Sequence, residues 1–355
     1  MEKKIALIEF SSNHYDFVIA TADFIGTRAN VEIFIHEDLS PSLKYEYETN
    51  YKLLHVPKIH QFTSYIELVK YSFSEFDEII FLSVTFTWKF IYYLYLIHKI
   101  RIPFSTTIHN LNSWLFFGKF NLKNLVRYFP KKYLLKKSKS LIVLNNRLKH
   151  NLSNYVSKDI LVIPFKIPTC NYQLKKSKKF TIVIPGTVDN KKRDYESIIK
   201  ILSHVNLDFM VILLGKMNEP GIRSKIIHNK KFKWFDNFVS QEDFDRYLKN
   251  CDLILAPTFQ KYTWGTSAME IYGETKASGA EFDCLKYKKR LLINDFYKIN
   301  SLLKTNNIVY YFFNLEDLKN KLNSLIINKG PDNNIEQIID SLNLELKHKF
   351  ISEWN

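Results

Sequence analysis

Residues 180–205 read FTIVIPGTVDNKKRDYESIIKILSHV, and this stretch indicates the type of fold. Its first part, Phe180–Pro185, is apolar at nearly every position, as expected for a strand buried on both faces of a parallel sheet. Residues 194–205 then show apolar residues at helical spacing on one face: Ile198, Ile199, Leu202 and Val205. A buried strand followed by an amphipathic helix is the repeating unit of α/β folds.

Short apolar runs and helical patterns alternate in the same way through most of the chain. The runs in the first half are Ile5–Phe10, Val31–Ile35, Glu78–Val84, Phe104–Ile108, Leu141–Leu144 and Ile160–Pro164. Those in the second half are Phe180–Pro185, Asp208–Leu214, Phe232–Phe235, Leu253–Ala256, Arg290–Ile293 and Ile308–Tyr311. Each run is interpreted as a strand. We therefore predict an α/β protein in which two Rossmann-like domains face each other across a cleft.

One segment between the two sets of strands has the composition of a linker. Residues 166–179 contain Pro168 and the basic run Lys175–Lys179, and they lack apolar periodicity. We predict a first domain at residues 1–166, a linker at 167–179 and a second domain at 180–333. Residues 334–355 show a helical pattern with no strand after it, and we expect this helix to pack back on the first domain.

The composition excludes several classes of protein. The 355 residues are 46% hydrophobic and include 28 Phe and 21 Tyr, which is incompatible with a disordered chain. The cysteines Cys170, Cys251 and Cys284 are too widely spaced for a disulfide framework or a zinc cluster. The longest apolar run, Phe90–Ile97, is far shorter than the about 20 residues of a membrane-spanning helix. We expect a soluble cytoplasmic protein.

Charge is distributed unevenly along the chain. The formal net charge is +15, and residues 79–158 hold 14 Lys and Arg but no Asp or Glu. In the densest part, residues 119–149, lysines alternate with Leu, Tyr and Phe, which indicates a surface that attracts polyanions. Nucleic acid and an anionic membrane leaflet are both candidates, and the interleaved apolar residues favour the membrane. The alternative is a solvated, lysine-rich face with no partner.

Residues just after strands are the candidates for function, because ligands of open α/β sheets bind beyond the carboxyl ends of the strands. After the first strand, Ser12, Asn13 and His14 form a polar loop that could bind an acceptor or a phosphate. The loop has no glycine, so a nicotinamide or flavin site is not expected. His109 ends the fourth strand and could hold a sugar hydroxyl or move a proton. A capped helix start and a strand-end histidine are the ordinary structural alternatives.

The second domain supplies two candidate binding segments. In the first, Gly186 turns the chain and Lys192 and Arg193 precede a helix, as in a pyrophosphate site, although a solvated basic turn has the same pattern. The second spans residues 270–292 and contains Glu274, Lys276, Ser278, Gly279 and Asp283. Small residues there let a nucleotide approach a helix N-terminus, where a carboxylate can hold ribose hydroxyls and a lysine can hold phosphate.

The order of these segments resembles the retaining, nucleotide-sugar-dependent glycosyltransferases of the two-domain GT-B fold, in particular family 4. That family has a strand followed by His-Asp, which corresponds to His109-Asn110, and a strand ending in Ile-Pro-Asn-Gly, which corresponds to residues 163–166. Its second domain opens with a strand, Gly-Arg and then Lys-Gly, and Gly186 and Lys192 fall at those places. Residues 213–216, which end in Lys216, are similar to its next strand end.

The sequence departs from this family at two places. Thr187 occupies the position of the family's arginine, and Arg193, directly after Lys192, could supply the guanidinium instead. The family also carries two glutamates separated by seven residues. Asp283 matches the second glutamate by its place before a strand, and Glu274 is the nearest partner for the first, at nine positions upstream rather than eight.

The resemblance implies a role for each candidate. His109 and Glu274 would be the catalytic residues, and Ser12, Asn13 and His14 would lie on the acceptor side. The donor site would comprise Gly186, Lys192, Arg193, Lys216, Lys276, Ser278, Gly279 and Asp283. The donor would be a nucleotide-diphosphate sugar. No metal or other cofactor would be needed, because the cations neutralise the diphosphate.

The resulting hypothesis is a retaining glycosyltransferase of surface polysaccharide synthesis that acts on a glycan, expected to be lipid-linked. Residues 119–149 would hold it at an anionic membrane surface, as a peripheral protein at the inner face of the cell membrane. The cations expected to face the membrane are Lys123, Arg127, Lys131, Lys132, Lys136 and Lys137, and the residues expected between the headgroups are Leu125, Tyr128, Phe129 and Leu134. The main alternative is a non-catalytic basic α/β protein that binds nucleic acid or membrane. We expect no nucleic-acid partner, because the chain has no nucleic-acid recognition motif. A transferase of related fold that builds glycosyl-phosphate polymers is a third possibility.

Overall fold

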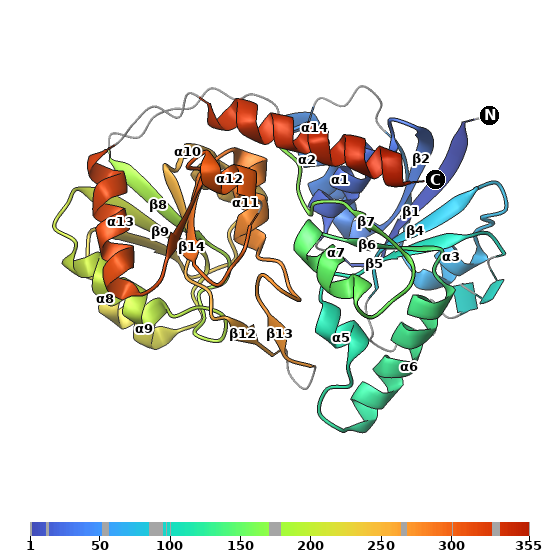
Figure 1. The fold of residues 1–355 in the computed structure, drawn as a ribbon, viewed down its shortest axis with the longest axis horizontal. Coiled ribbons are helices and arrows are strands. Elements are labelled where there is room, and N and C mark those ends of the chain that lie inside the picture. Colours follow the sequence, from blue (N-terminus) through green and yellow to red (C-terminus); the bar gives the residue numbers. More distant parts are fainter. Residues whose placement is uncertain are drawn as a thin grey trace.

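The computed structural model describes residues 2–11, 14–51, 57–84, 95–96, 98–99, 101–169, 179–263, 268–299, 301–328 and 334–354. Within these residues, the first half of the chain forms a seven-stranded parallel sheet with the order β3-β2-β1-β4-β5-β6-β7 (Figure 1). Its strands are β1 (Lys3–Glu9), β2 (Ala29–His36), β3 (Lys58–Phe62), β4 (Glu78–Ser83), β5 (Phe104–Thr107), β6 (Ser140–Val143) and β7 (Asp159–Val162).

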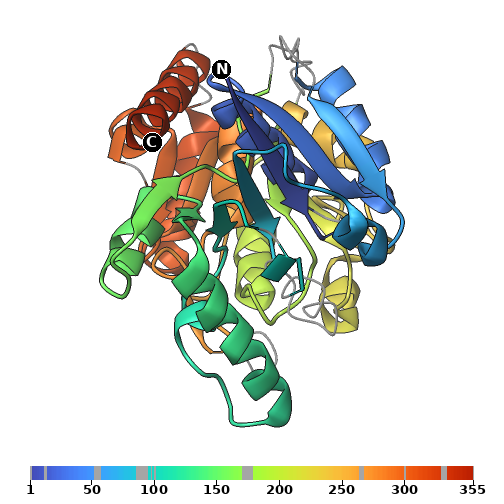
Figure 2. The ribbon, with the colours of Figure 1, turned by 90° about the vertical axis from the view of Figure 1, so that its right-hand side faces the viewer.

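Helices connect these strands. They are α1 (Tyr15–Ile25), the short 3-10 helix η1 (Glu37–Leu39), α2 (Ser40–Thr49), α3 (Tyr65–Lys70), α5 (Leu111–Leu115), α6 (Leu122–Lys137) and α7 (Asn146–Ser153). Helix α1 is buried along most of its length because its apolar residues surround the helix. Helix α6 differs from it, since it projects away from the body of the molecule (Figure 2).

The described part of the second half forms a six-stranded parallel sheet with the order β10-β9-β8-β11-β14-β15. Its strands are β8 (Phe180–Pro185), β9 (Phe209–Lys216), β10 (Phe232–Phe235), β11 (Leu253–Ala256), β14 (Arg290–Asn294) and β15 (Val309–Phe312). A small antiparallel pair is made of β12 (Lys261–Tyr262) and β13 (Glu270–Ile271). The helices are α8 (Tyr195–His204), α9 (Pro220–Ile226), α10 (Gln241–Asn250), α11 (Gly279–Tyr287), α12 (Ser301–Thr305) and α13 (Leu315–Ile327).

These two parallel sheets confirm the predicted α/β class. Strand β3 was not predicted from the sequence, because its residues, KIHQF, show no clear alternation of apolar and polar side chains. In the structure only Phe62 of this strand is fully buried. It lies at the edge of the sheet, where a strand needs little apolar cover. Strand order reverses beside β1 in the first sheet and beside β8 in the second. A crevice for ligands opens at the carboxyl ends of the strands at such a reversal.

The last helix, α14 (Ile335–Glu353), crosses from the second half of the chain to the first (Figure 1). It packs on α1, where the rings of Phe350 and Phe24 are 5.8 Å apart and Nζ of Lys347 lies 2.5 Å from Oδ2 of Asp23. A buried cluster of charged side chains from α1, α2, α10 and α11 also joins the halves. The domains therefore contact each other through apolar and charged side chains.

Candidate functional site

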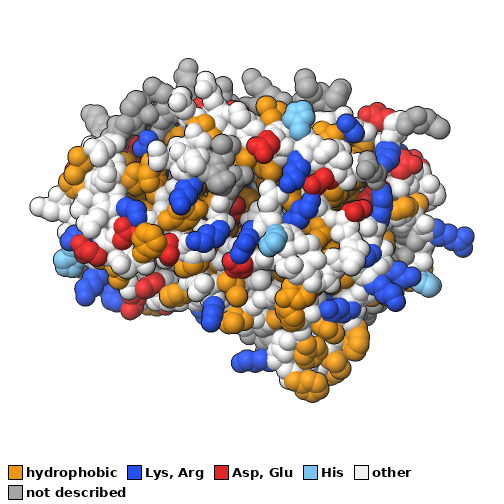
Figure 3. All heavy atoms as spheres, viewed as in Figure 1, with side chains coloured by type: hydrophobic (Ala, Val, Ile, Leu, Met, Phe, Trp, Pro, Cys, Tyr) orange, Lys and Arg blue, Asp and Glu red, His pale blue; other side chains and the backbone are white. Residues whose placement is uncertain are grey.

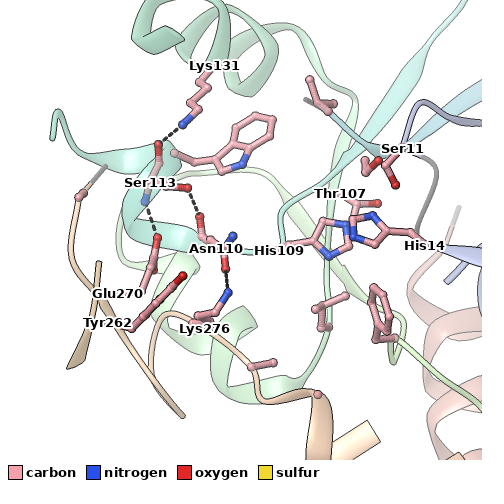
Figure 4. A pocket seen from close by; sticks show the side chains of 18 of the residues that line it. Ser11, His14, Thr107, His109, Asn110, Ser113, Lys131, Tyr262, Glu270 and Lys276 are labelled. Carbon is pink, nitrogen blue, oxygen red and sulfur yellow. Dashed lines mark hydrogen bonds between the residues drawn. The ribbon is translucent and has the colours of Figure 1, made fainter. Parts of the chain in front are cut away.

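A cavity of about 850 Å³ lies between the two halves, where the first residues after several strands meet. The described residues that line it from the first half are Ser11, His14, Ser83, Val84, Thr107, His109, Asn110, Ser113, Trp114, Arg127, Lys131, Leu144 and Phe165. Those from the second half are Lys192, Tyr262, Ala268, Glu270, Lys276, Ala277, Gly279 and Phe282. Figure 4 shows the principal polar side chains of this cavity.

Two histidines lie side by side in the first-domain wall of the cavity. The ring centroids of His14 and His109 are 5.1 Å apart. Nε2 of His109 lies 2.9 Å from the carbonyl oxygen of Leu82, so Nε2 carries the proton and Nδ1 is an acceptor. Burial lowers the pKa of His109 to about 3 and the pKa of His14 to about 4. Both rings are therefore neutral at physiological pH and suited to hydrogen-bonding a hydroxyl group.

The predicted acceptor loop is only partly visible. Ser12 and Asn13 lie outside the described residues, whereas His14 lines the cavity. Two neighbouring cavity residues, Ser11 and Ser83, are held by Glu9 behind them. The buried carboxylate of Glu9 accepts hydrogen bonds from the backbone N–H of Ser11, at 2.6 Å, and from the hydroxyl of Ser83. Burial raises the pKa of Glu9 to about 7.

Lys276 belongs to the second domain but is positioned by the first. Its backbone forms an antiparallel bridge with Asn110, and its Nζ donates a 2.6 Å hydrogen bond to Oδ1 of the same residue. The backbone N–H of Leu111 donates to the carbonyl of Thr275 at 2.8 Å. The fold thus brings the predicted donor residue Lys276 directly beside the predicted segment that contains His109.

Lys192 and Lys276 form a cationic pair on the second-domain wall. The ring of Tyr262 lies near both, at 5.4 Å from Nζ of Lys192 and 5.8 Å from Nζ of Lys276. Burial lowers the pKa of Lys276 to about 8, and the charge of Lys192 acts in the same direction. Two cations beside the same aromatic ring are well suited to a ligand with two neighbouring negative charges.

The N-terminus of α11 opens onto the same wall. Ser278 is its N-cap residue, and the backbone N–H of Ser278 donates a 2.6 Å hydrogen bond to the hydroxyl of Tyr297. Gly279 lines the cavity, and a Cβ at this position would meet no atom within 4 Å. The first turn of α11 is therefore open to a ligand, and its dipole favours a negative group.

Ser278 itself is buried and does not line the cavity, and neither do three other predicted donor residues: Gly186, Arg193 and Lys216. Gly186 has a φ of +97°, and a Cβ there would come within 3.1 Å of the guanidinium of Arg193. Nη1 of Arg193 donates to the carbonyl of Thr187 and to the hydroxyl of Tyr195, both at 3.2 Å. Lys216 is exposed at the end of β9. Arg193 therefore supports the turn at Gly186.

The two predicted carboxylates also lie elsewhere. Glu274 accepts a 2.7 Å hydrogen bond from Nη2 of Arg147 and a 3.0 Å bond from Nδ2 of Asn151. Asp283 is buried, and its Oδ1 accepts a 2.8 Å hydrogen bond from Nζ of Lys166. Neither residue lines the cavity, because each is held by a side chain of the opposite half. Their positions do not support the predicted catalytic and ribose-binding roles.

Three charged residues of the cavity had no predicted role there. The carboxylate of Glu270 accepts hydrogen bonds from the backbone N–H groups of Asn112, at 3.2 Å, and Ser113, at 2.7 Å. Arg127 and Lys131 enter from α6, and Nζ of Lys131 donates to the carbonyl of Ser113 at 2.5 Å. The four-residue spacing of the two cations on a helix is the only sequence signal that they share a face.

Two parallel α/β sheets with a cavity at the reversal of strand order define the GT-B architecture, and the predicted fold is confirmed. The lipopolysaccharide outer core galactosyltransferase WaaB is similar, with a TM-score of 0.58 and 12% identity over 98% of each chain. Sucrose-phosphate synthase from Thermosynechococcus elongatus has a TM-score of 0.59 and 10% identity over 99% of this chain and 98% of that one.

UDP-GlcNAc 2-epimerase from Methanocaldococcus jannaschii is also similar, with a TM-score of 0.55 and 13% identity over 96% of this chain and 99% of that chain. At such low identities the likeness shows the fold. No family model matches the chain, and no curated protein matches its sequence.

Two features of the described residues concern the expected partners. In the part of the chain that the structure describes, no three His, Cys, Asp or Glu side chains gather as metal ligands would. The described helices also include none that is both long and apolar enough to cross a membrane.

Proposed function

We propose that this protein is a glycosyltransferase that moves a sugar from a nucleoside-diphosphate sugar to a glycan acceptor. The observation that carries the proposal is the contrast between the two walls of one cavity. Lys192, Lys276 and the N-terminus of α11 face it from the second domain, and the neutral His14 and His109 face it from the first. A diphosphate suits the cationic wall of the second domain, and sugar hydroxyls suit the wall of the first domain that carries the histidines. The similarity to structures named as glycosyltransferases supports this function.

The proposed chemistry follows from the charges. Lys192 and Lys276 neutralise the diphosphate as its bond to the sugar breaks, which stabilises the leaving nucleoside diphosphate. In other transferases a divalent metal neutralises the diphosphate. Because the two lysines can do this here, we propose transfer without a metal. Nδ1 of His109 accepts a hydrogen bond from a hydroxyl of the reacting sugar. Retention of configuration is proposed from the resemblance to family 4.

A melting-shift screen followed by a transfer assay tests this function. One of the UDP, GDP, ADP, CMP or dTDP sugars should raise the melting temperature, because a ligand that binds only the folded state stabilises it. Release of the nucleotide should then depend on an acceptor and continue in EDTA. Loss of turnover in EDTA, restored by manganese or magnesium, would contradict the metal-free mechanism. No shift with any nucleotide sugar would contradict the function itself.

Two other functions are separated by the same assays. Several similar structures are named UDP-GlcNAc 2-epimerases. An epimerase would convert UDP-GlcNAc in the absence of any acceptor, whereas a transferase releases UDP only when an acceptor is present. A non-catalytic basic protein would show no turnover and would bind nucleic acid in a salt-sensitive way.

The acceptor is proposed to be lipid-linked, with the protein docked peripherally at the inner face of the cell membrane through residues 119–149. Helix α6 and the loop before it form a projecting tip (Figure 2). Figure 3 shows apolar side chains gathered at this end of the molecule. Those with large exposed areas are Phe116, Phe120, Leu122, Val126, Phe129 and Tyr133. Such a tip can enter the headgroup region of a bilayer while nearby lysines attract anionic lipids.

The structure revises which residues of this segment can face lipid. Leu134, which the sequence predicted to dip between headgroups, is 1% exposed and belongs to the core. Arg127 and Lys131, predicted as membrane-facing cations, line the cavity instead. Of the predicted cations, Lys136 and Lys137 are exposed and remain candidates for contact with anionic headgroups. Lys119, at the start of the segment, is exposed as well and joins them.

A further inference from the structure

Arg127 and Lys131 form a second cationic pair in the cavity, on the acceptor side. They lie one turn apart on α6, and Nζ of Lys131 is held 2.5 Å from the carbonyl oxygen of Ser113. In Figure 4, Lys131 and Lys276 approach from opposite sides, with Ser113 and Asn110 between them. The α6 pair is therefore set apart from the donor pair.

The charges of the cavity exceed what the donor needs. Its described charged residues are one carboxylate, Glu270, and four cations, Arg127, Lys131, Lys192 and Lys276. A nucleoside-diphosphate sugar carries one negative charge on each phosphate, so the net charge of +3 from these five residues exceeds the −2 of the donor. Burial and the nearby Arg127 lower the pKa of Lys131 to about 8. A bound anion would favour the charged form of this lysine.

Helix α6 separates these cations from its apolar residues. The exposed residues Leu122, Val126, Phe129 and Tyr133 recur at helical spacing and form one stripe. At about 3.6 residues per turn, Arg127 and Lys131 fall on the opposite side of the helix. A smaller hollow shares both cations with the cavity and is lined further by aromatic residues of the tip: Phe116, Phe117 and Tyr128. The cationic pair is therefore continuous with the base of the apolar tip.

We propose that Arg127 and Lys131 bind a phosphate ester of the acceptor, which makes the acceptor a phosphate-linked glycan and not a neutral sugar. This inference rests on the transferase function proposed above and adds the chemistry of its second substrate. The phosphate is held by the α6 pair while an acceptor hydroxyl lies near the histidines. A lipid phosphate and a soluble sugar phosphate share this chemistry, and the aromatic hollow favours the lipid.

The test measures binding of inorganic pyrophosphate to the full chain by calorimetry. The nucleoside diphosphate that stabilises the protein most is kept at saturation, so that it fills the donor site. Pyrophosphate should still bind, and Arg127→Gln/Lys131→Gln should weaken this binding by about 10-fold or more while nucleotide affinity stays within about twofold. Lys131→Arg keeps the charge and should retain binding. Lys136→Gln/Lys137→Gln removes the same charge from an exposed part of α6 and should change neither affinity.

Displacement of the nucleotide by pyrophosphate would overturn the inference, because all four cations would then serve the donor. So would an equal loss of both affinities in Arg127→Gln/Lys131→Gln, or normal pyrophosphate binding by that variant. If no nucleotide binds, the transferase function fails. In that case the role of the α6 pair is tested separately, by measuring pyrophosphate binding to the same variants without nucleotide.

Two arms identify the source of the phosphate. One uses neutral phosphatidylcholine vesicles with or without a polyprenyl phosphate, and the other uses soluble N-acetylglucosamine 1-phosphate. Binding to the phosphate-bearing vesicles that is lost in Arg127→Gln/Lys131→Gln identifies a lipid phosphate. Binding of the soluble compound alone identifies a sugar phosphate. Binding in neither arm overturns the inference.

Discussion

Nζ of Lys286 lies 2.9 Å from Oδ1 of Asp16, although 270 residues separate them in the sequence. The lysine belongs to α11 of the second domain and is 0% exposed, and the aspartate belongs to α1 of the first. The same Nζ lies 2.8 Å from Oε1 of Glu46. Lys166 adds a second bridge, at 3.1 Å from Asp16 and 2.8 Å from Asp283. Buried ion pairs therefore fix the two domains to each other.

Replacing Lys286 by Met should strongly destabilise the protein, because Glu46 would stay buried without its cation and Asp16 would keep only Lys166. Removal of one partner of a buried ion pair costs about 3–5 kcal/mol, whereas an exposed pair contributes below about 1 kcal/mol. The matched control is Lys225→Met, which breaks the exposed pair with Glu196. Urea unfolding measures both. Equal stability of the two variants would show that the buried cluster does not stabilise the fold.

Glu281 should make stability depend on pH. Burial raises the pKa of Glu281 from its ordinary value of 4.5 to about 7. The folded state therefore holds this proton more tightly than the unfolded state. The stability from this group is full below pH 4.5 and is lost as the pH rises through 7.

Glu281→Gln tests this dependence. Tyr297 donates to Oε2 of Glu281 at 2.5 Å, and Asn145 donates to the same oxygen at 3.3 Å, so an amide oxygen can keep both bonds. The variant should exceed the wild type in free energy of unfolding by about 1–3 kcal/mol at pH 8 and match it near pH 4. Urea unfolding across this range measures the difference. A difference that does not change with pH would refute the assignment.

Lys192→Ala and Lys276→Gln should each lower turnover by about 10- to 100-fold, because each removes a charge-assisted contact to the diphosphate. Glutamine at position 276 can still donate to Asn110, which preserves the domain contact. Lys216→Ala removes an exposed lysine outside the cavity and should leave kcat/KM for the donor unchanged. If all three variants behave alike, the diphosphate binds elsewhere.

Arg193→Ala should affect stability more than turnover. Its guanidinium bonds to Thr187 and Tyr195 beside the turn at Gly186, and loss of these bonds should cost about 1–2 kcal/mol. Its effect on kcat/KM should be smaller than that of Lys192→Ala. Unfolding and turnover are measured on the same preparations. If stability is unchanged and turnover falls more than in Lys192→Ala, Arg193 contacts the donor as the sequence predicted.

Phe120→Ser and Phe129→Ser should weaken binding to anionic vesicles by about 10-fold each, because each removes an apolar side chain that enters the bilayer. Phe120 is 89% exposed, and Phe238 in the second domain is 88% exposed. The control variant Phe238→Ser should therefore bind vesicles as the wild type does. Co-sedimentation at low and high salt measures this binding, which salt should weaken. Equal binding of the wild type to neutral and anionic vesicles would contradict the proposed attraction between the lysines and anionic lipids.

The sequence by itself determined the two parallel sheets, because the patterns that specify them are local. Continuous apolar runs such as Leu253–Ala256 form strands that are buried on both faces, and helical spacing identifies the segments between them. The positions of His109 and Lys276 after strands likewise predicted that they would lie near the cleft. The edge strand β3 was not predicted, because a strand at the edge of a sheet needs little apolar burial and so lacks a clear apolar pattern.

Only the tertiary structure decided which charged side chains reach the cavity. Asp283 looked like a ligand-binding carboxylate from its place in the chain, yet it pairs with Lys166, 117 residues away. Arg127 and Lys131 looked like surface cations, yet the packing of α6 turns them inward. A buried charge must pair with the nearest opposite charge, and packing between distant segments sets that neighbour. Local sequence pattern carries no information about which distant segment that will be.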